Sequence, residues 1–190
     1  LQSAEAAAAA AILGVQHRCN LRLADGFFEN NQAAKLQIIE QIRLHQPQII
    51  LANALSDRHP DHARAGHMVA EACFLAGLRK IETSHNGSPQ AAHRPQLVLH
   101  YIQDYIQTPS FVHDVSPYLD QKIAAIRAYK TQFYVAGVEL NEAPTYISNP
   151  AFMDLIVSRS REYGKSINVP HAEGFLSKKT LGVNSLFDLK

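Results

Sequence analysis

Several features that would place this chain in a special class are absent from it. Its 190 residues include only two cysteines, Cys19 and Cys73, too few for a disulfide framework. No apolar run approaches the roughly 20 residues that a membrane-spanning helix needs. With a formal net charge of +1, the sequence shows no basic stripe that would hold a nucleic-acid backbone. No Gly-x-Gly-x-x-Gly or phosphate-loop pattern follows a predicted strand, which argues against a nucleotide-binding domain.

The residues that are present have the composition of an ordinary globular protein. Hydrophobic residues make up 46% of the chain and charged residues 18%, and the length allows one domain with a substantial core. We find no internal repeat and no interdomain linker, and we predict a single domain over residues 1–190. Both cysteines lie in apolar contexts, so we expect reduced core thiols in a cytoplasmic protein.

Predicted strands and helices alternate along the chain. Apolar periodicity, caps and turn residues predict strands at 18–23, 48–52, 96–102, 110–115 and 173–176, and helices at 4–13, 32–45, 61–76, 116–132 and 151–163. Residues 83–94 are predicted to form a loop. The alternation indicates an α/β fold with a parallel sheet and right-handed crossovers. Because such a domain normally begins with a strand, we expect a first βα unit upstream of the helix at 4–13.

The most informative stretch runs from Ser56 to His62, where the predicted strand ends and a helix begins. In open α/β sheets this crevice is where ligands bind. A helix N-terminus favours the Asp61 carboxylate but disfavours extra positive charge, so His59 and His62 need another reason to gather there. Metal binding is one such reason, because neutral imidazole is a common metal ligand. The other interpretation is a pair of polar loop residues, since metal sites normally need three or four ligands.

Several further motifs occur in a characteristic order along the chain. They are Leu23 to Gly26, the run His59-Pro60-Asp61-His62, Gly66, Ala76 to Lys80, His93-Arg94-Pro95, Glu173-Gly174-Phe175 and Asn184 to Leu189. In this order the motifs resemble those of the zinc-dependent LmbE-like, or PIG-L-like, N-acetylglucosaminyl deacetylases. Within that family the chain is most similar to the deacetylase type of bacillithiol biosynthesis. The resemblance covers nearly the whole chain.

The resemblance implies a fold, a cofactor and a set of site residues. The fold would be a Rossmann-like three-layer α/β sandwich with a mostly parallel sheet, and the cofactor zinc or another divalent transition metal. His62 would be a metal ligand. His59 would be catalytic, facing the acetamide carbonyl, with Asp61 as its orienting carboxylate. Arg94 and Asp25 would bind substrate.

One part of the family pattern is absent from these residues. Family members begin with a strand and an Ala-His-Pro-Asp-Asp motif, which supplies the other zinc ligands and the general base. The resemblance therefore implies that these groups lie upstream of Leu1. Our leading hypothesis is a deacetylase of an N-acetylglucosamine conjugate, a small amino-sugar substrate such as N-acetylglucosaminyl malate, in a homo-oligomer. The alternative is a non-catalytic sugar- or metal-binding protein on the same scaffold.

Overall fold

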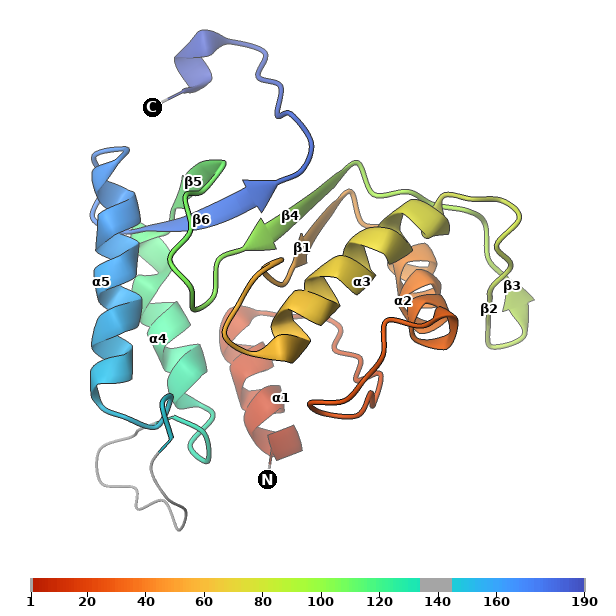
Figure 1. Cartoon of the computed structure of the whole chain (residues 1–190), viewed down its shortest axis with the longest axis horizontal. Helices are drawn as coiled ribbons and strands as arrows, with labels where there is room; N and C mark the ends of the chain where they lie inside the picture. Colours follow the sequence, from red (N-terminus) through yellow and green to blue (C-terminus); the bar gives the residue numbers. More distant parts are fainter. Residues whose placement is uncertain (1, 134–144, 190) are drawn as a thin grey trace. The chain divides into compact units, whose positions relative to one another are not determined.

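The computed structural model describes residues 2–133 and 145–189 (Figure 1). Packing divides the chain into two compact units, each built from two segments. Unit 1 comprises Leu1–Asn20 and Val112–Glu173, and unit 2 comprises Leu21–Phe111 and Gly174–Lys190. The single domain expected over residues 1–190 stays a prediction, and the two units are described separately.

Unit 2 contains the alternating strands and helices. Its elements are α2 (Gln32–His45), β1 (Ile49–Ala52), α3 (Pro60–Ala76), the short strands β2 (Ser84–His85) and β3 (Ser88–Pro89), β4 (Leu97–Tyr101) and the 3-10 helix η2 (Leu186–Asp188). The strands β5 (Phe111–Asp114) and β6 (Ala172–Ser177) each pass from one unit to the other. The predicted helices at 32–45 and 61–76 are confirmed. The predicted loop at 83–94 contains the small β2–β3 hairpin.

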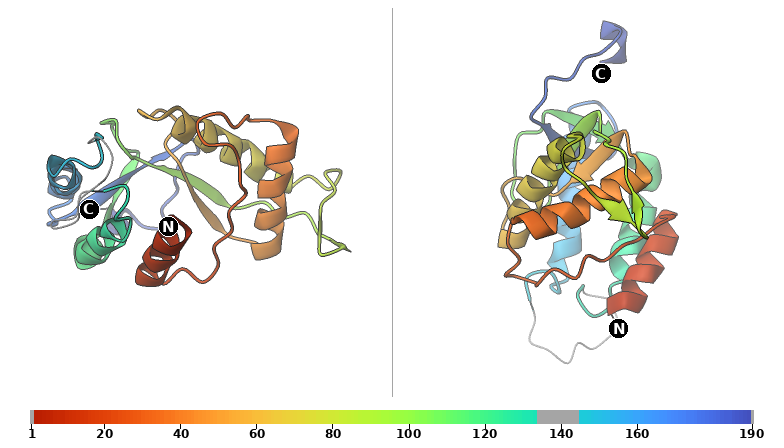
Figure 2. Two further views of the ribbon diagram at one scale, coloured as in Figure 1. Left: turned by 90° about the horizontal axis from the view of Figure 1, so that it is seen from below. Right: turned by 90° about the vertical axis from the view of Figure 1, so that its right-hand side faces the viewer.

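Helices α2 and α3 lie side by side (Figure 2). Each begins at a capping side chain. Asn31 accepts a hydrogen bond from the Ala34 N–H at 2.9 Å, and His59 caps α3 directly before Pro60. The apolar faces of the two helices form the core of unit 2 together with Ile50 of β1 and Val98 of β4. The buried residues of this core are Ile39, Ile42, Ala72, Cys73 and Ala76. These helices therefore cover one face of the β1–β4 pair.

The described strands form a mixed sheet in the order β1-β4-β6-β5. Strands β1 and β4 are parallel, with Ile49 opposite Leu97, whereas β4 and β6 are antiparallel, with Leu99 opposite Ser177. The α/β class is confirmed. The predicted strand at 18–23 is wrong, because Arg22 has a φ of 55° in the left-handed region and interrupts any extended run.

Unit 1 is mainly helical. It contains α1 (Gln2–Leu13), the 3-10 helix η1 (Ser116–Tyr118), α4 (Leu119–Arg127) and α5 (Ala151–Lys165). Helix α1 packs against α4, and the Gln121 amide donates to the Ile12 carbonyl at 2.6 Å. The helix predicted at 116–132 is shorter than expected, since it begins as a 3-10 turn and ends at Arg127. None of the helices in the described ranges has the length and apolar character needed to cross a bilayer.

The two cysteines lie in opposite environments. Cys73 is buried in the unit 2 core, as expected, and burial raises the pKa of its thiol to about 11. Cys19 is exposed, which corrects the prediction of two core thiols. Because thiolate is the reactive form, we expect a thiol-specific disulfide reagent at pH 8 to modify Cys19 in the native protein and Cys73 only after unfolding. Rapid native modification of both cysteines would contradict this placement.

A buried histidine gives the protein a defined loss of stability in acid. His100 of β4 is 1% exposed, and its Nδ1 lies 2.8 Å from the Asn53 carbonyl oxygen, to which it donates. Burial lowers the pKa of His100 below its usual 6.5. The unfolded chain therefore takes up a proton below pH 6.5 before the native protein does, and native stability falls as the pH decreases through this window.

We expect His100→Gln, whose amide can still donate to Asn53, to reduce this acid sensitivity. The loss of unfolding free energy on acidification should be smaller in the variant by at most about 1.4 kcal/mol per pH unit. Urea unfolding of both proteins at pH 7.5 and 5.5 measures it. Equal losses of unfolding free energy in the two proteins would show that His100 does not stay neutral in the fold.

Candidate functional site

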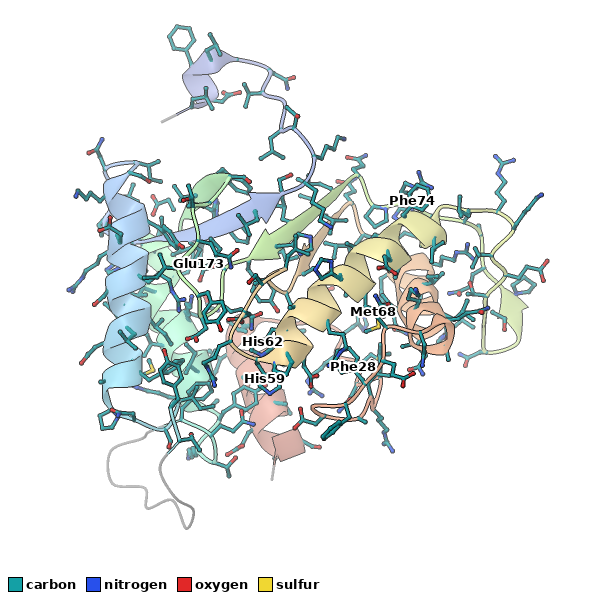
Figure 3. All side chains as sticks on the ribbon, in the orientation of Figure 1. Phe28, His59, His62, Met68, Phe74 and Glu173 are labelled. Atoms are coloured by element: carbon teal, nitrogen blue, oxygen red, sulfur yellow. The ribbon has the colours of Figure 1, made fainter. Side chains whose placement is uncertain are left out.

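The two histidines singled out in the sequence lie together at the start of α3 (Figure 3). The chain reaches them from the carboxyl end of β1 through a short loop. This loop can pack closely against α3 because Gly66 has no side chain: a Cβ there would lie 2.6 Å from the Asn53 carbonyl oxygen. The imidazole rings of His59 and His62 have centroids 5.0 Å apart. Both rings thus lie at the strand-to-helix crevice where α/β proteins bind ligands.

The hydrogen bond of His62 determines which of its nitrogens is available. Its Nδ1 lies 2.6 Å from Oδ2 of Asp57, whose side chain is 0% exposed. Burial alone would raise the pKa of Asp57, but hydrogen bonds from His62 and from the Arg58 and Tyr105 backbone leave that pKa below its usual value. Since an ionised carboxylate only accepts hydrogen bonds, Nδ1 carries the proton. The neutral imidazole of His62 then has its lone pair on Nε2, the form that binds a metal ion.

His59 has the opposite arrangement. Its Nδ1 accepts a hydrogen bond from the Asp61 backbone N–H at 3.2 Å, as the N-cap of α3. A neutral ring that accepts at Nδ1 carries its proton on Nε2. His59 can therefore donate a proton or a hydrogen bond from Nε2. The neighbouring imidazoles thus differ in chemistry: His62 offers a lone pair and His59 offers a proton.

Asp61 makes contacts that the sequence did not predict. Its carboxylate accepts from the Gly26 N–H at 2.6 Å and from the Arg64 guanidinium at 2.5 Å. Asp61 contacts the His59 ring through its backbone N–H. Its carboxylate bonds Gly26 and Arg64 instead, so it does not orient that ring by a hydrogen bond. Asp61 instead ties the start of α3 to the turn that contains Asp25. The i, i+3 spacing of Asp61 and Arg64 was the available sequence signal for this pair.

Asp25, His59 and Asp61 form a group that could hold a metal ion. Among the described residues, one potential ligand atom from each lies within 4.8 Å of the others. However, the Arg64 cation beside Asp61 opposes a second positive charge there. The Nδ1 of His59 also already accepts a hydrogen bond. The hydrogen bonds of these side chains therefore favour His62 as the metal ligand. Asp25 lies close enough to the start of α3 to contact a bound substrate.

Arg94 lies away from these residues. Its guanidinium donates to the Phe74 carbonyl at 3.0 Å and stacks on the Phe74 ring at 4.3 Å. Figure 3 shows Phe74 at the opposite end of α3 from His59 and His62. Fifteen residues of helix separate His59 from Phe74, a distance of about 20 Å. The structure therefore brings His59, Asp61, His62 and Asp25 together, but not Arg94.

Comparison with known proteins points to the same family as the sequence motifs. Residues 1–73 match the PIG-L family, described as GlcNAc-PI de-N-acetylase. The chain is 30% identical over 127 residues to diacetylchitobiose deacetylase of Thermococcus kodakarensis, a match that covers 65% of this chain and 46% of the relative. Residues 1–73 are therefore similar to a PIG-L family domain. The resemblance read from the sequence is thereby confirmed, while the bacillithiol type stays a prediction. The chain spans about half the length of this curated relative.

Solved structures show that the fold of this chain is shared with proteins of different activities. A conserved protein of Thermus thermophilus matches with a TM-score of 0.81 and 29% identity, over 96% of this chain and 76% of that one. N,N'-diacetylchitobiose deacetylase of Pyrococcus horikoshii (TM-score 0.68, 22% identity) is matched over 88% of this chain and 59% of that one. The 4-carboxy-2-hydroxymuconate hydratase of Pseudomonas putida (TM-score 0.73, 21% identity) is matched over 96% of this chain and 72% of that one. These matches confirm a Rossmann-like sandwich, and function must be argued from the site.

Proposed function

We propose that this chain belongs to a hydrolase that removes the N-acetyl group from an N-acetylglucosamine conjugate, and that residues at the start of α3 bind its metal ion and donate a proton. The observation that carries the proposal is the pair of imidazoles at the start of α3, one with a free lone pair and one with an available proton. The PIG-L family domain and the relative named as a deacetylase of an acetylated amino sugar support this reaction class.

His62 would hold a divalent ion through Nε2, with Asp57 fixing the ring. Zinc is our candidate because it accepts imidazole and carboxylate ligands. The chemistry that such an ion supplies when bound is a water molecule acidic enough to ionise near neutral pH. The carboxylates of Asp25 and Asp61 lie close to the start of α3, where a metal ion would be bound. The described residues therefore fit part of a metal centre, and the other ligands of that centre are not assigned among them. The proposal therefore concerns His62 as one ligand of the centre.

His59 would act on the reacting amide. When water adds to the acetamide carbonyl, the oxygen becomes negatively charged, and a donor positioned there stabilises charge that is present only in that state. The Nε2–H of His59 is such a donor, placed at the positive end of α3. The amine of glucosamine also needs a proton to leave, which His59 can deliver.

For the substrate, we propose that Asp25 accepts a hydrogen bond from a sugar hydroxyl. Its carboxylate is exposed in a turn beside His59. N-acetylglucosaminyl malate, of bacillithiol biosynthesis, is the candidate conjugate suggested by the sequence resemblance. Arg94 is left out of the proposed site of this chain, because its guanidinium is bonded at the other end of α3. A cytoplasmic location is proposed on the free state of both cysteines.

Acetate release tests the proposed reaction. The purified full-length protein, loaded with zinc, should release acetate from N-acetylglucosaminyl malate or from N,N'-diacetylchitobiose, and a chelator should abolish release until zinc is restored. Sugar binding by calorimetry without any acetate would contradict the hydrolase and support the non-catalytic alternative.

We also propose that the protein is a homo-oligomer in which the C-terminal tail contacts a second copy. The tail beyond β6 exposes five large apolar side chains, among them Phe187, which is 99% exposed. The others are Leu181, Val183, Leu186 and Leu189. Exposed apolar patches mark protein interaction sites, and these five side chains lie close together in the sequence. Phe27, which is 86% exposed and lies outside the tail, provides the control. Light scattering should show an oligomer whose mass falls in Phe187→Ser but not in Phe27→Ser, whereas a monomeric protein would contradict the proposal.

A further inference from the structure

Asp57 is the most completely buried carboxylate near the candidate site. Its side chain is 0% exposed, and burial of a carboxylate is costly unless hydrogen-bond donors surround it. Its donors include the ring of His62 at 2.6 Å, the Arg58 N–H at 2.7 Å, the Asp104 N–H at 3.2 Å and the Tyr105 backbone N–H. Asp57 therefore contacts both the candidate metal ligand and a separate segment of the chain, the loop that follows β4.

The loop after β4, residues 102–107, is joined to the loop after β1 at several points. The Asn53 amide donates to Gln103 at 3.0 Å, and the Gln107 amide donates to the Ser56 carbonyl at 3.0 Å. Arg58 and Asp104 form an ion pair at 3.2 Å. The Asp57 carboxylate accepts hydrogen bonds both from His62 and from the backbone of residues 102–107. It therefore connects the two parts of this network.

We propose that Asp57 is a positioning residue that fixes His62 with Nε2 free for the metal and holds the 102–107 loop against the same corner. This inference deepens the proposed function, because it concerns the same metal centre. A hydrogen-bonded carboxylate orients an imidazole ligand and raises its basicity, and loss of such a partner typically weakens metal binding by about 10–100-fold. The exposed side chains of the loop, Tyr105 and Ile106, would then be held at the edge of the site.

The test uses Asp57→Asn, which keeps the side-chain volume but removes the negative charge. We expect its zinc dissociation constant, measured by calorimetry, to rise by about 10–100-fold. Glu40→Gln is the control, because Glu40 accepts from His85 at 2.8 Å in a second, more exposed carboxylate–imidazole pair of unit 2. The control should bind zinc as the unsubstituted protein does.

Two readouts need neither metal nor turnover. Nitrogen-15 NMR of the metal-free, unsubstituted protein should show His62 protonated on Nδ1, and Asp57→Asn should lower the population of that tautomer. Amide exchange at Asp104 and Tyr105 should become faster in the variant. His62 protonated on Nε2 in the unsubstituted protein would overturn the inference even if the variant fails to fold.

The outcomes separate this inference from the proposed reaction. If no acetate is released but the His62 tautomer and zinc affinity respond to Asp57→Asn, the positioning role stands and the deacetylase proposal fails. If acetate is released while the tautomer, the zinc affinity and the amide exchange are all unchanged in Asp57→Asn, the positioning role is wrong and the deacetylase proposal stands.

Discussion

Replacement of His59 by alanine is expected to lower kcat for acetate release by about 10²–10⁴-fold, the range for loss of a general acid. The reason is the direction of its hydrogen bonds: Nδ1 accepts from the Asp61 backbone, which leaves Nε2 as the donor toward the reacting amide. Zinc affinity should change little, since the lone pair assigned to the metal belongs to His62. Steady-state kinetics and zinc calorimetry on one preparation measure both effects.

His67→Ala is the control for His59→Ala, because His67 is an exposed histidine on the same helix. It should leave kcat unchanged. Equal activity of His59→Ala and the unsubstituted protein would remove His59 from the mechanism. A large loss of zinc binding in His59→Ala would instead mean that the ion is held by the group of Asp25, His59 and Asp61.

Replacement of Arg43 by methionine is expected to lower the free energy of unfolding by about 3 kcal/mol, because it removes the hydrogen bonds that one charged guanidinium donates to three carbonyls. Arg43 of α2 is buried, and its guanidinium donates to the carbonyl oxygens of Ala76 at 3.1 Å, Leu78 at 3.0 Å and Ile81 at 2.6 Å. These carbonyls lie at and just beyond the C-terminal end of α3, where helix carbonyls lack partners within the helix. Methionine fills much of the volume but donates no hydrogen bond. The Ala76 and Leu78 carbonyls keep the backbone N–H donors of His93 and Ile81, at 3.0 and 3.1 Å, whereas the Ile81 carbonyl loses its guanidinium donor.

Urea unfolding monitored by circular dichroism measures the effect of Arg43→Met. Arg79→Met serves as the control, because Arg79 lies on the surface in the same region. A change below about 0.5 kcal/mol in Arg43→Met, the usual size for a surface substitution, would show that water or other donors replace the guanidinium.

The sequence predicted the helices of unit 2 well because their signals are local. Asn31 and His59 cap α2 and α3, and the apolar periodicity of each helix continues to its observed end. The strand expected at 18–23 failed for a reason that alternation cannot reveal, the left-handed backbone of Arg22. The end of α4 at Arg127 was also missed, since no strong stop signal occurs there.

The site was predicted in its residue types but not in its contacts. The His-x-x-His spacing located the two imidazoles, because a helix start fixes their separation. Asp57 and Asp61 flank His59 in sequence, and the sequence could not show that Asp57 contacts His62 while Asp61 contacts Arg64. Arg94 was assigned to the site from the order of the motifs alone. That order could not show that Arg94 lies beside Phe74, at the end of α3 away from His59.

The identity of the metal ligand is tested most directly by zinc-edge anomalous diffraction from crystals of the protein soaked in zinc. We predict an ion about 2.0–2.1 Å from Nε2 of His62, with Nδ1 still bonded to Asp57. An ion bound among Asp25, His59 and Asp61, with the His62 ring unliganded, would contradict the assignment on which the proposed mechanism depends.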